Sequence, residues 1–242
     1  MELVVLGTGD AFSRTRTGAS AVVLAPRGPV LIDAPDGVLR ALDAASRASG
    51  RALDPMRIDD VLLTHLHGDH ANGLEAFGFL RWIERQRSGA PAPRLHTHAA
   101  AAARLWERLA PAMDQGGKAT LADYFDVRVL PEGGTSTVAG LSVRHRMGVH
   151  PVPSCGFLAS DGSSTLGWSG DTAWDPAHVE WLSAADLVVH ETSGGPTHTP
   201  VERLNALPPA LRSRMALIHM PDGFDPGCTT LRLLRDGELV TV

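Results

Sequence analysis

The sequence predicts an α/β (α+β) protein in which two β-sheets pack face to face and carry helices on their outer faces. Short apolar or β-branched runs alternate with segments of helical periodicity in the first half of the chain. The second half opens with several short strands separated by Gly, Pro and Asp, after which helices return. No clean repeat or low-complexity linker separates the two halves, so we expect residues 1–242 to form one domain.

The first half is expected to contain strands and long helices in alternation. Strands are predicted over residues 2–6, 20–24, 30–33, 58–64 and 94–97. Helical spacing of apolar side chains predicts helices over 37–49, from Asp69 or His70 through Ile83, and over 99–113. The loop after the first strand contains Gly7 and Gly9, but neither a third glycine nor a clear helix follows. This excludes a dinucleotide-binding fingerprint.

The second half is expected to contain shorter strands. Those over 124–130, 137–143, 155–160 and 164–169 are predicted to form a meander. A helix over 176–184, a strand over 187–190, a helix over 201–206 and a last internal strand over 216–219 are predicted to follow. The tail, residues 231–242, has Asp236-Gly237 at its centre, so we expect a terminal hairpin there.

Composition and charge exclude several classes of protein. Hydrophobic residues make up 43% and charged residues 20% of the chain, and no apolar run approaches the roughly 18 residues of a membrane span. We see no signal segment and expect a cytoplasmic protein. Cys155 and Cys228 are too few for a disulfide framework. A net charge of −5 argues against general nucleic-acid coating, and we interpret Arg81, Arg85 and Arg87 as a solvated helix face.

The most informative stretch follows the apolar run 61–63, where four possible metal ligands lie within six positions: His65, His67, Asp69 and His70. Alternate residues of an extended segment face the same way, so the first two can point to one place, and the turn can bring the others beside them. Hydrogen-bonded loop histidines are the alternative. No core or cap needs so many imidazoles together, whereas zinc binds imidazole and carboxylate, so the pattern predicts two metal ions.

Three further residues at strand ends can complete such a site. His150 follows a strand-like stretch, Asp171 ends the run 166–170, and His219 ends the last internal strand. His145 is the rival of His150, because the chain between them can loop either way.

Together these residues resemble the metallo-β-lactamase-fold hydrolase superfamily, whose pattern His-x-His-x-Asp-His is matched by residues 65–70. The resemblance implies a four-layer αββα sandwich with the metals at one edge between the sheets. It implies one ion held by His65, His67 and His150, another by Asp69, His70 and His219, and Asp171 as the bridge. It further implies hydrolysis by a water that two divalent ions activate, with Asp69 also serving catalysis; Zn²⁺ is favoured, and Mn²⁺ or Fe²⁺ would tolerate the same ligands.

Within the superfamily the chain is most similar to the ribonuclease Z and phosphodiesterase branch and its arylsulfatase-like neighbours. The similar segments are 6–12, 30–33, His150 with Cys155-Gly156-Phe157, His190-Glu191-Thr192 and His198-Thr199. In ribonuclease Z enzymes a histidine and an acidic partner in these loops assist protonation of the leaving group, which implies that role for His198 and Glu191. The alternative is that His190 and Glu191 cap a strand and that His198 is exposed.

The expected substrate follows from a departure from the ribonuclease Z pattern. Enzymes of that kind that cut precursor tRNA usually carry a long arm between the third histidine ligand and the bridging aspartate. Asp171 follows His150 by 21 positions, which leaves room for two strands only. We therefore expect a small anionic phosphodiester as substrate in preference to tRNA, with Arg14 and Arg16 available to meet it.

Other functions remain open at this point. The same metals could serve hydrolysis of a thioester, lactone or sulfate ester, and tRNA 3′-end cleavage is the less favoured phosphodiester alternative. A non-catalytic metal-binding or small-molecule-binding protein would use the fold without turnover. A mononuclear iron oxygenase is disfavoured because it does not need the full second set of ligands. The sequence predicts no membrane partner and leaves a homodimer open.

Overall fold

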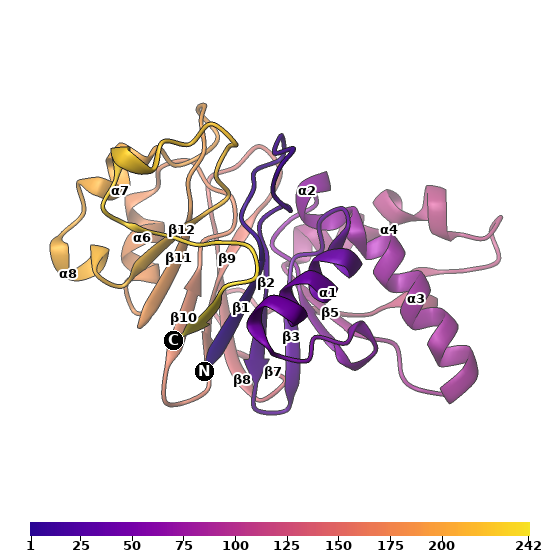
Figure 1. Ribbon diagram of the computed structural model, residues 1–242. Helices are drawn as coiled ribbons and strands as arrows, with labels where there is room; N and C mark the ends of the chain where they lie inside the picture. Colours follow the sequence, from indigo (N-terminus) through magenta and orange to yellow (C-terminus); the bar gives the residue numbers. More distant parts are fainter.

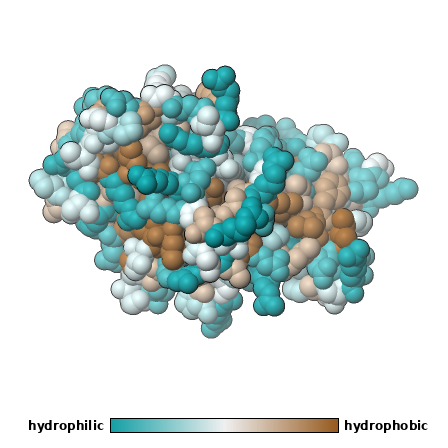
Figure 2. Space-filling model, viewed as in Figure 1, coloured by the Kyte–Doolittle hydropathy of each residue, from teal (hydrophilic) through white to brown (hydrophobic).

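The computed structural model describes residues 1–242 and consists of four layers, with helices outside two seven-stranded sheets (Figure 1). The predicted αββα arrangement is therefore confirmed. The two chain termini lie close together at the lower edge of the sheets in this view. Hydrophilic residues cover much of the same face, with apolar residues visible in smaller areas over both halves (Figure 2).

The first sheet has the strand order β14-β1-β2-β3-β4-β5-β6. Its strands are β1 (Glu2–Gly7), β2 (Ser20–Ala25), β3 (Gly28–Ile32), β4 (Asp60–Leu62), β5 (Arg94–Thr97), β6 (Asp126–Val129) and β14 (Leu239–Thr241). Strands β14 to β3 pair antiparallel, whereas β3 to β6 pair parallel. Parallel neighbours need a crossover, and helices supply each of these connections.

The second sheet has the order β13-β12-β11-β10-β9-β8-β7. Its strands are β7 (Ser136–Val138), β8 (Leu141–Met147), β9 (Cys155–Ser160), β10 (Thr165–Trp168), β11 (Leu187–Glu191), β12 (Met215–Ile218) and β13 (Arg232–Leu233). Strands β7 to β10 form an antiparallel meander, and β10 to β13 pair parallel.

Helices cover the outer face of each sheet (Figure 1). On the first sheet these are α1 (Val38–Ser49), α2 (Gly68–Ala71), α3 (Gly73–Ser88), α4 (Ala99–Met113) and α5 (Leu121–Tyr124). On the second sheet they are α6 (Pro176–Leu182), α7 (Val201–Asn205) and α8 (Pro209–Arg212). Single 3₁₀ turns occupy Pro55–Arg57 and Pro226–Cys228. None of the helices combines the length and apolar character needed to cross a membrane.

Alternating side chains of the strands fill the three spaces between the layers. In β1, Leu3 and Val5 point into the core between the sheets, whereas Val4 and Leu6 pack against the helices of the first sheet. A strand that is covered on both faces must be apolar at every position, which explains the continuous apolar runs that marked these strands in the sequence.

The predicted terminal hairpin is wrong. Strand β13 pairs parallel with β12 in the second sheet, whereas β14 pairs antiparallel with β1 in the first. Between them the Asp236 carboxylate accepts hydrogen bonds from Thr8 and Thr17 of the loop after β1. The two short strands thus satisfy the open edges of two different sheets instead of each other.

The predicted four-strand meander of the second half is wrong in its first two members. The second, over 137–143, is a hairpin in which β7 and β8 pair antiparallel across a turn at Ala139 and Gly140. The first belongs to the other sheet. Strand β6 belongs to the first sheet and pairs parallel with β5. Tyr124, at the start of the predicted strand, ends helix α5 and is fully buried, where its hydroxyl donates to the Met113 carbonyl at 2.8 Å. Helix α4 is the crossover that brings β6 beside β5, a pairing that a short β-branched run does not encode by itself.

The predicted helix after His70 is divided into α2 and α3. Gly73 lies at the division, where its N–H donates to the Ala34 carbonyl at 2.8 Å. A Cβ at this position would lie 2.2 Å from the Pro35 carbonyl oxygen, so only glycine permits the contact. This close approach holds the loop of residues 65–70 against the end of β3.

A buried histidine in the second sheet predicts how stability depends on pH. Burial lowers the pKa of His178 to about 4, and His190 and Arg146 act in the same direction. Its Nε2 lies 3.0 Å from the Ser169 carbonyl and its Nδ1 lies 3.1 Å from Arg146 Nη1, which fits a neutral ring that donates to the first and accepts from the second. The folded chain therefore keeps His178 neutral under conditions in which the unfolded chain takes up a proton.

We expect the free energy of unfolding to fall as the pH decreases from about 6.5 towards 4, with this histidine contributing about 2 kcal/mol of the loss between pH 7 and 5. His178→Gln keeps one donor and one acceptor but cannot titrate. Urea unfolding at pH 7 and at pH 5 measures how much unfolding free energy each protein loses between them. The loss should be smaller in the variant than in the wild type by about 2 kcal/mol. An equal loss in the two proteins would contradict the assignment.

Candidate metal centre

The histidine loop begins where β4 ends, and a buried aspartate anchors its first residue. Asp33 follows β3 directly and has a left-handed backbone, with φ 57°. Its carboxylate accepts hydrogen bonds from the N–H and hydroxyl of Thr64, both at 2.8 Å. Because β3 and β4 pair parallel, the residues after them emerge at the same edge of the sheet.

The remaining predicted ligands also follow strand ends. His150 comes three residues after β8, Asp171 three residues after β10, and His219 directly after β12. His219 has φ 61° and Gly170 has φ 59°, which are left-handed conformations. Left-handed backbone in a non-glycine residue occurs often at functional sites, where the surrounding structure holds it.

The structure brings the seven predicted ligands together as two groups that share Asp171. One group consists of His65, His67, His150 and Asp171, and the other of Asp69, His70, Asp171 and His219; in each, the candidate ligand atoms lie within 4.8 Å of one another. The division is the one implied by the resemblance. His145, the rival of His150, lies within β8 and belongs to neither group.

The first group has the dimensions of a metal site. His67 Nδ1 lies 3.1 Å from both His65 Nε2 and His150 Nε2, and Asp171 Oδ2 lies 3.8 Å from His65 Nε2. Ligands at the usual ~2.0–2.1 Å around a tetrahedral Zn²⁺ are about 3.3 Å apart. Hydrogen bonding alone is a poor account of three converging ring nitrogens, because at most one proton fits between each pair, whereas a cation can bind all three.

The second group has similar spacing. His70 Nε2 lies 3.3 Å from Asp69 Oδ2 and from Asp171 Oδ1, and His219 Nε2 lies 3.2 Å from Asp69 Oδ2 and 3.4 Å from Asp171 Oδ2. His70 Nε2 is buried and has no hydrogen-bond partner. The residues present therefore fit a divalent cation in this position as well.

Hydrogen bonds on the far side of the rings hold the histidines in orientation. His70 Nδ1 lies 2.8 Å from the Asp33 carboxylate, His65 Nδ1 lies 3.0 Å from the Thr64 hydroxyl, and His150 Nδ1 lies 3.1 Å from the Thr197 carbonyl. Such partners fix the ring and the tautomer of a ligating histidine. No role was predicted for Asp33, Thr64 or Thr197, although Asp33 lies in a segment that is similar to the family.

Charges in the centre compensate one another. Burial would raise the pKa of Asp171, but His219 and His70 hold it well below its ordinary value. Burial would likewise lower the pKa of His70, but the carboxylates of Asp171 and Asp33 raise it well above. His65 has its pKa lowered, mainly by burial. An anionic carboxylate surrounded by imidazoles is the charge pattern of a cation site.

Glu191 and His198 lie beside the second group. His198 Nδ1 is 3.2 Å from Glu191 Oε1 and 4.0 Å from Asp171 Oδ2, and its ring stacks on His219 with centroids 5.1 Å apart. The same Glu191 oxygen accepts the N–H groups of Thr172 and Thr199. Burial raises the pKa of Glu191, whereas the Glu191 carboxylate raises the pKa of His198 against the effect of burial.

His190 lies apart from both groups. It is fully buried, and its Nδ1 lies 2.7 Å from the Glu191 carbonyl.

Of the two arginines predicted to meet the substrate, only one lies beside the site. Arg16 lines a polar cavity of about 420 Å³ that reaches Asp69, whereas Arg14 is exposed outside it.

The interpretation of Arg81, Arg85 and Arg87 as a solvated helix face is wrong for Arg81, which is only 3% exposed and binds Asp59 at 2.6 Å. Its donors satisfy carbonyl oxygens of the turn before β4.

Comparison with solved structures confirms the fold. The metallo-β-lactamase-fold protein YhfI from Bacillus subtilis superposes with a TM-score of 0.78 at 15% identity, covering 99% of this chain and 98% of that one. The chain therefore has the metallo-β-lactamase fold that the resemblance implied.

The family is identified by sequence. The family model described as Anti-Pycsar protein Apyc1 matches residues 1–235, and the chain belongs to this family. The Anti-Pycsar protein Apyc1 of Paenibacillus sp. (strain J14) is 29% identical over 256 residues, covering 100% of this chain and 99% of that protein. The cGMP-dependent 3′,5′-cGMP phosphodiesterase A of Dictyostelium discoideum is 22% identical over 258 residues. That alignment covers 99% of this chain and 28% of the Dictyostelium enzyme.

The two rival histidines provide a matched test of the ligand assignment. We expect His150→Ala to lower the bound metal, measured by elemental analysis after dialysis, because it removes one ligand of the first group. His145→Ala should retain the wild-type metal content, since that ring lies outside both groups. Equal loss in the two variants, or loss in His145→Ala alone, would contradict the assignment.

Proposed function

We propose that the chain is a metal-dependent phosphodiesterase that opens the cyclic phosphodiester of a nucleotide. The observation that carries the proposal is the pair of ligand groups joined by Asp171, with His198 and Glu191 directly beside them. Two divalent cations, Zn²⁺ by preference for these imidazole-rich donors, would lower the pKa of a water towards neutrality and stabilise charge on the phosphate.

Each protein group has a separate part in this reaction. His65, His67 and His150 would hold one ion, Asp69, His70 and His219 the other, and Asp171 both. Asp69 and Arg16 line the same cavity, where the carboxylate would help to hold the ion and the guanidinium would offer a positive charge to the phosphate. Asp33 and the other outer hydrogen-bond partners keep the histidine rings in place.

The proton for the departing oxygen would come from His198. Its Nδ1 is hydrogen-bonded to Glu191, and Glu191 is in turn held by two backbone N–H groups. This leaves Nε2, on the opposite side of the ring, to hold a proton for the alkoxide. A ribose alkoxide is a poor leaving group, so general acid catalysis of this kind contributes about 10²–10⁴-fold.

Two observations favour a small cyclic nucleotide over tRNA. Only β9 and β10 lie between His150 and Asp171, so this interval contains no projecting arm. The Dictyostelium relative, named for the hydrolysis of 3′,5′-cGMP, aligns with nearly the whole of this chain. Thioester, lactone and sulfate-ester hydrolysis have no comparable support.

The metal-loaded protein should hydrolyse a 3′,5′-cyclic nucleotide and methyl p-nitrophenyl phosphate in a substrate panel that includes a thioester, a lactone and a sulfate ester. His198→Ala should lower kcat on the cyclic nucleotide by about 100-fold, because the alkoxide loses its proton donor. On the aryl diester the loss should be only a few-fold, since nitrophenolate leaves without a proton.

The control for this experiment is His145→Ala, which should resemble the wild type on both diesters. Rapid turnover of the thioester or lactone with no diester cleavage would overturn the proposed function. An equal loss on both diesters in His198→Ala would leave the phosphodiesterase assignment intact and remove His198 as the proton donor.

A further inference from the structure

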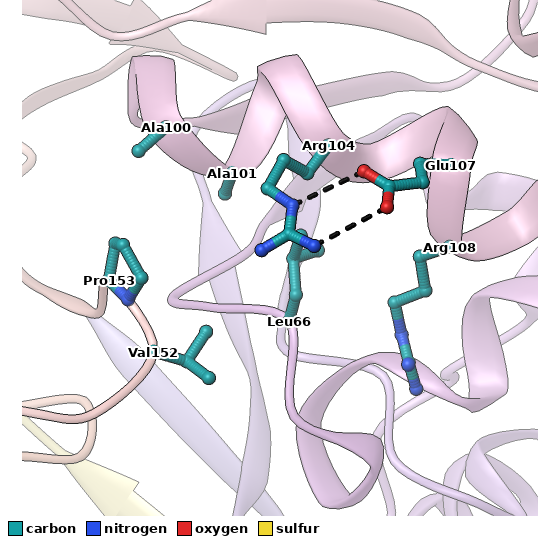
Figure 3. A pocket seen from close by; sticks show the side chains of 8 residues that line it. All are labelled: Leu66, Ala100, Ala101, Arg104, Glu107, Arg108, Val152 and Pro153. Atoms are coloured by element: carbon teal, nitrogen blue, oxygen red, sulfur yellow. Dashed lines mark hydrogen bonds and ion pairs between the residues drawn. The ribbon is translucent and has the colours of Figure 1, made fainter.

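The loop that carries His150 has little packing to hold it in place. Val149, the residue before the ligand, is 56% exposed. Farther along the same loop, Val152 and Pro153 line a cavity of about 380 Å³ beside α4 (Figure 3). Exposed side chains and a cavity on one side give a loop few buried contacts, so a metal ligand in it needs polar contacts to fix its position.

The pairing of strands does not fix this loop relative to Asp171. His150 follows β8 and Asp171 follows β10, and β9 lies between these two strands in the sheet. Both strands are antiparallel to β9, so the two loops emerge at the same edge of the sheet but share no ladder of hydrogen bonds. The contact between them must therefore come from the loops themselves.

Thr172, directly after Asp171, provides that contact. It is 1% exposed, and its hydroxyl accepts the Val149 N–H at 3.0 Å and donates to the Ala173 carbonyl at 2.8 Å. The Ala173 N–H in turn donates to the Val149 carbonyl at 2.7 Å. Both backbone polar groups of Val149 are therefore engaged, one position before the ligand His150.

The two loops can approach this closely because the residue before Val149 is a glycine. A Cβ on Gly148 would lie 2.9 Å from both the Cβ and the Oγ1 of Thr172. Any side chain there would push the two loops apart and lengthen the hydrogen bond to the hydroxyl. Gly148 and Thr172 therefore form one closely fitted contact.

The backbone of Thr172 also reaches the proposed proton donor. Its N–H donates to Glu191 Oε1 at 3.0 Å, and its carbonyl accepts from the Thr199 hydroxyl at 2.9 Å. Thr199 follows His198 directly in the chain. These two contacts involve only the main chain, so they do not depend on the hydroxyl that holds Val149.

We propose that Thr172 is a positioning residue of the metal centre, whose hydroxyl holds the loop of His150 at the distance from Asp171 that the first ligand group requires. The inference deepens the proposed function and rests on it, since it assumes that this group binds an ion. Hydrogen-bond partners outside the ligands contribute about 10–100-fold to metal affinity. Because His150 belongs to the first group only, loss of the hydroxyl should weaken the binding of one ion and spare the other.

The test compares Thr172→Val, which has nearly the same shape without the hydroxyl, with Thr172→Ser, which keeps the hydroxyl. Metal-free protein is titrated with Zn²⁺ against a chelating indicator, without substrate, so the readout is affinity and not turnover. We expect Thr172→Val to bind one of two ions about tenfold more weakly and the other as the wild type does. Thr172→Ser should restore the affinity for the weakened ion.

Thr229→Val is the matched control. Its hydroxyl likewise accepts a backbone N–H, from Leu231, and donates to an oxygen, of the Asn205 side chain, in a segment that carries none of the ligands. This variant should bind both ions as the wild type does. Should Thr172→Val fail to fold, Gly148→Ala disturbs the same contact while keeping the hydroxyl, and it should show the same selective loss.

Unchanged affinity for both ions in a folded Thr172→Val, even one with a lower free energy of unfolding, would overturn the inference. An equal loss in Thr172→Ser, or equal weakening of both ions, would overturn it as well, and in each case the proposed function stands. Wild-type protein that binds two ions but cleaves no phosphodiester would overturn the proposed function alone. Wild-type protein that binds no Zn²⁺ would overturn both.

Discussion

The contacts between the buried Asp171 carboxylate and the histidines around it are the interaction on which the rest of the site depends. It is 2% exposed and lies within 4.0 Å of nitrogens from His65, His70, His198 and His219. A carboxylate in such a place is costly unless positive charge surrounds it. Histidines from both sheets gather around this one group, so the site exists only where the two sheets meet. The ligand groups are therefore complete only when the two sheets are packed together.

The sequence predicts which side chains lie together at the ends of the strands better than it predicts the path of the chain. Closely spaced ligands directly after a buried run can be located because strand geometry and strand ends fix where they emerge. The tail could not be placed, because β13 and β14 pair with strands far away in the sequence. The same holds for β6, whose partner is set by the crossover of α4. The role of Asp33 could not be predicted, because its contact with His70 forms only when β3 and β4 are paired.

The residues on which the proposed choice of substrate rests lie outside the two ligand groups. The interval before Asp171 holds two strands and no arm, and His198 is placed by Glu191 beside the shared carboxylate. A cavity beside α4 is lined in part by Leu66, which lies between His65 and His67 in the chain, and by Val152 and Pro153 of the loop after His150.

We propose that two ions, held by ligand groups that share Asp171, act together on a cyclic phosphodiester. The decisive experiment strips the protein of metal and measures hydrolysis of a 3′,5′-cyclic nucleotide as Zn²⁺ is returned in counted equivalents per chain. We expect activity to rise steeply only as the second equivalent binds, because each ligand group then holds its own ion. Full activity at one equivalent, or activity that is independent of added metal, would show that the two groups do not act together.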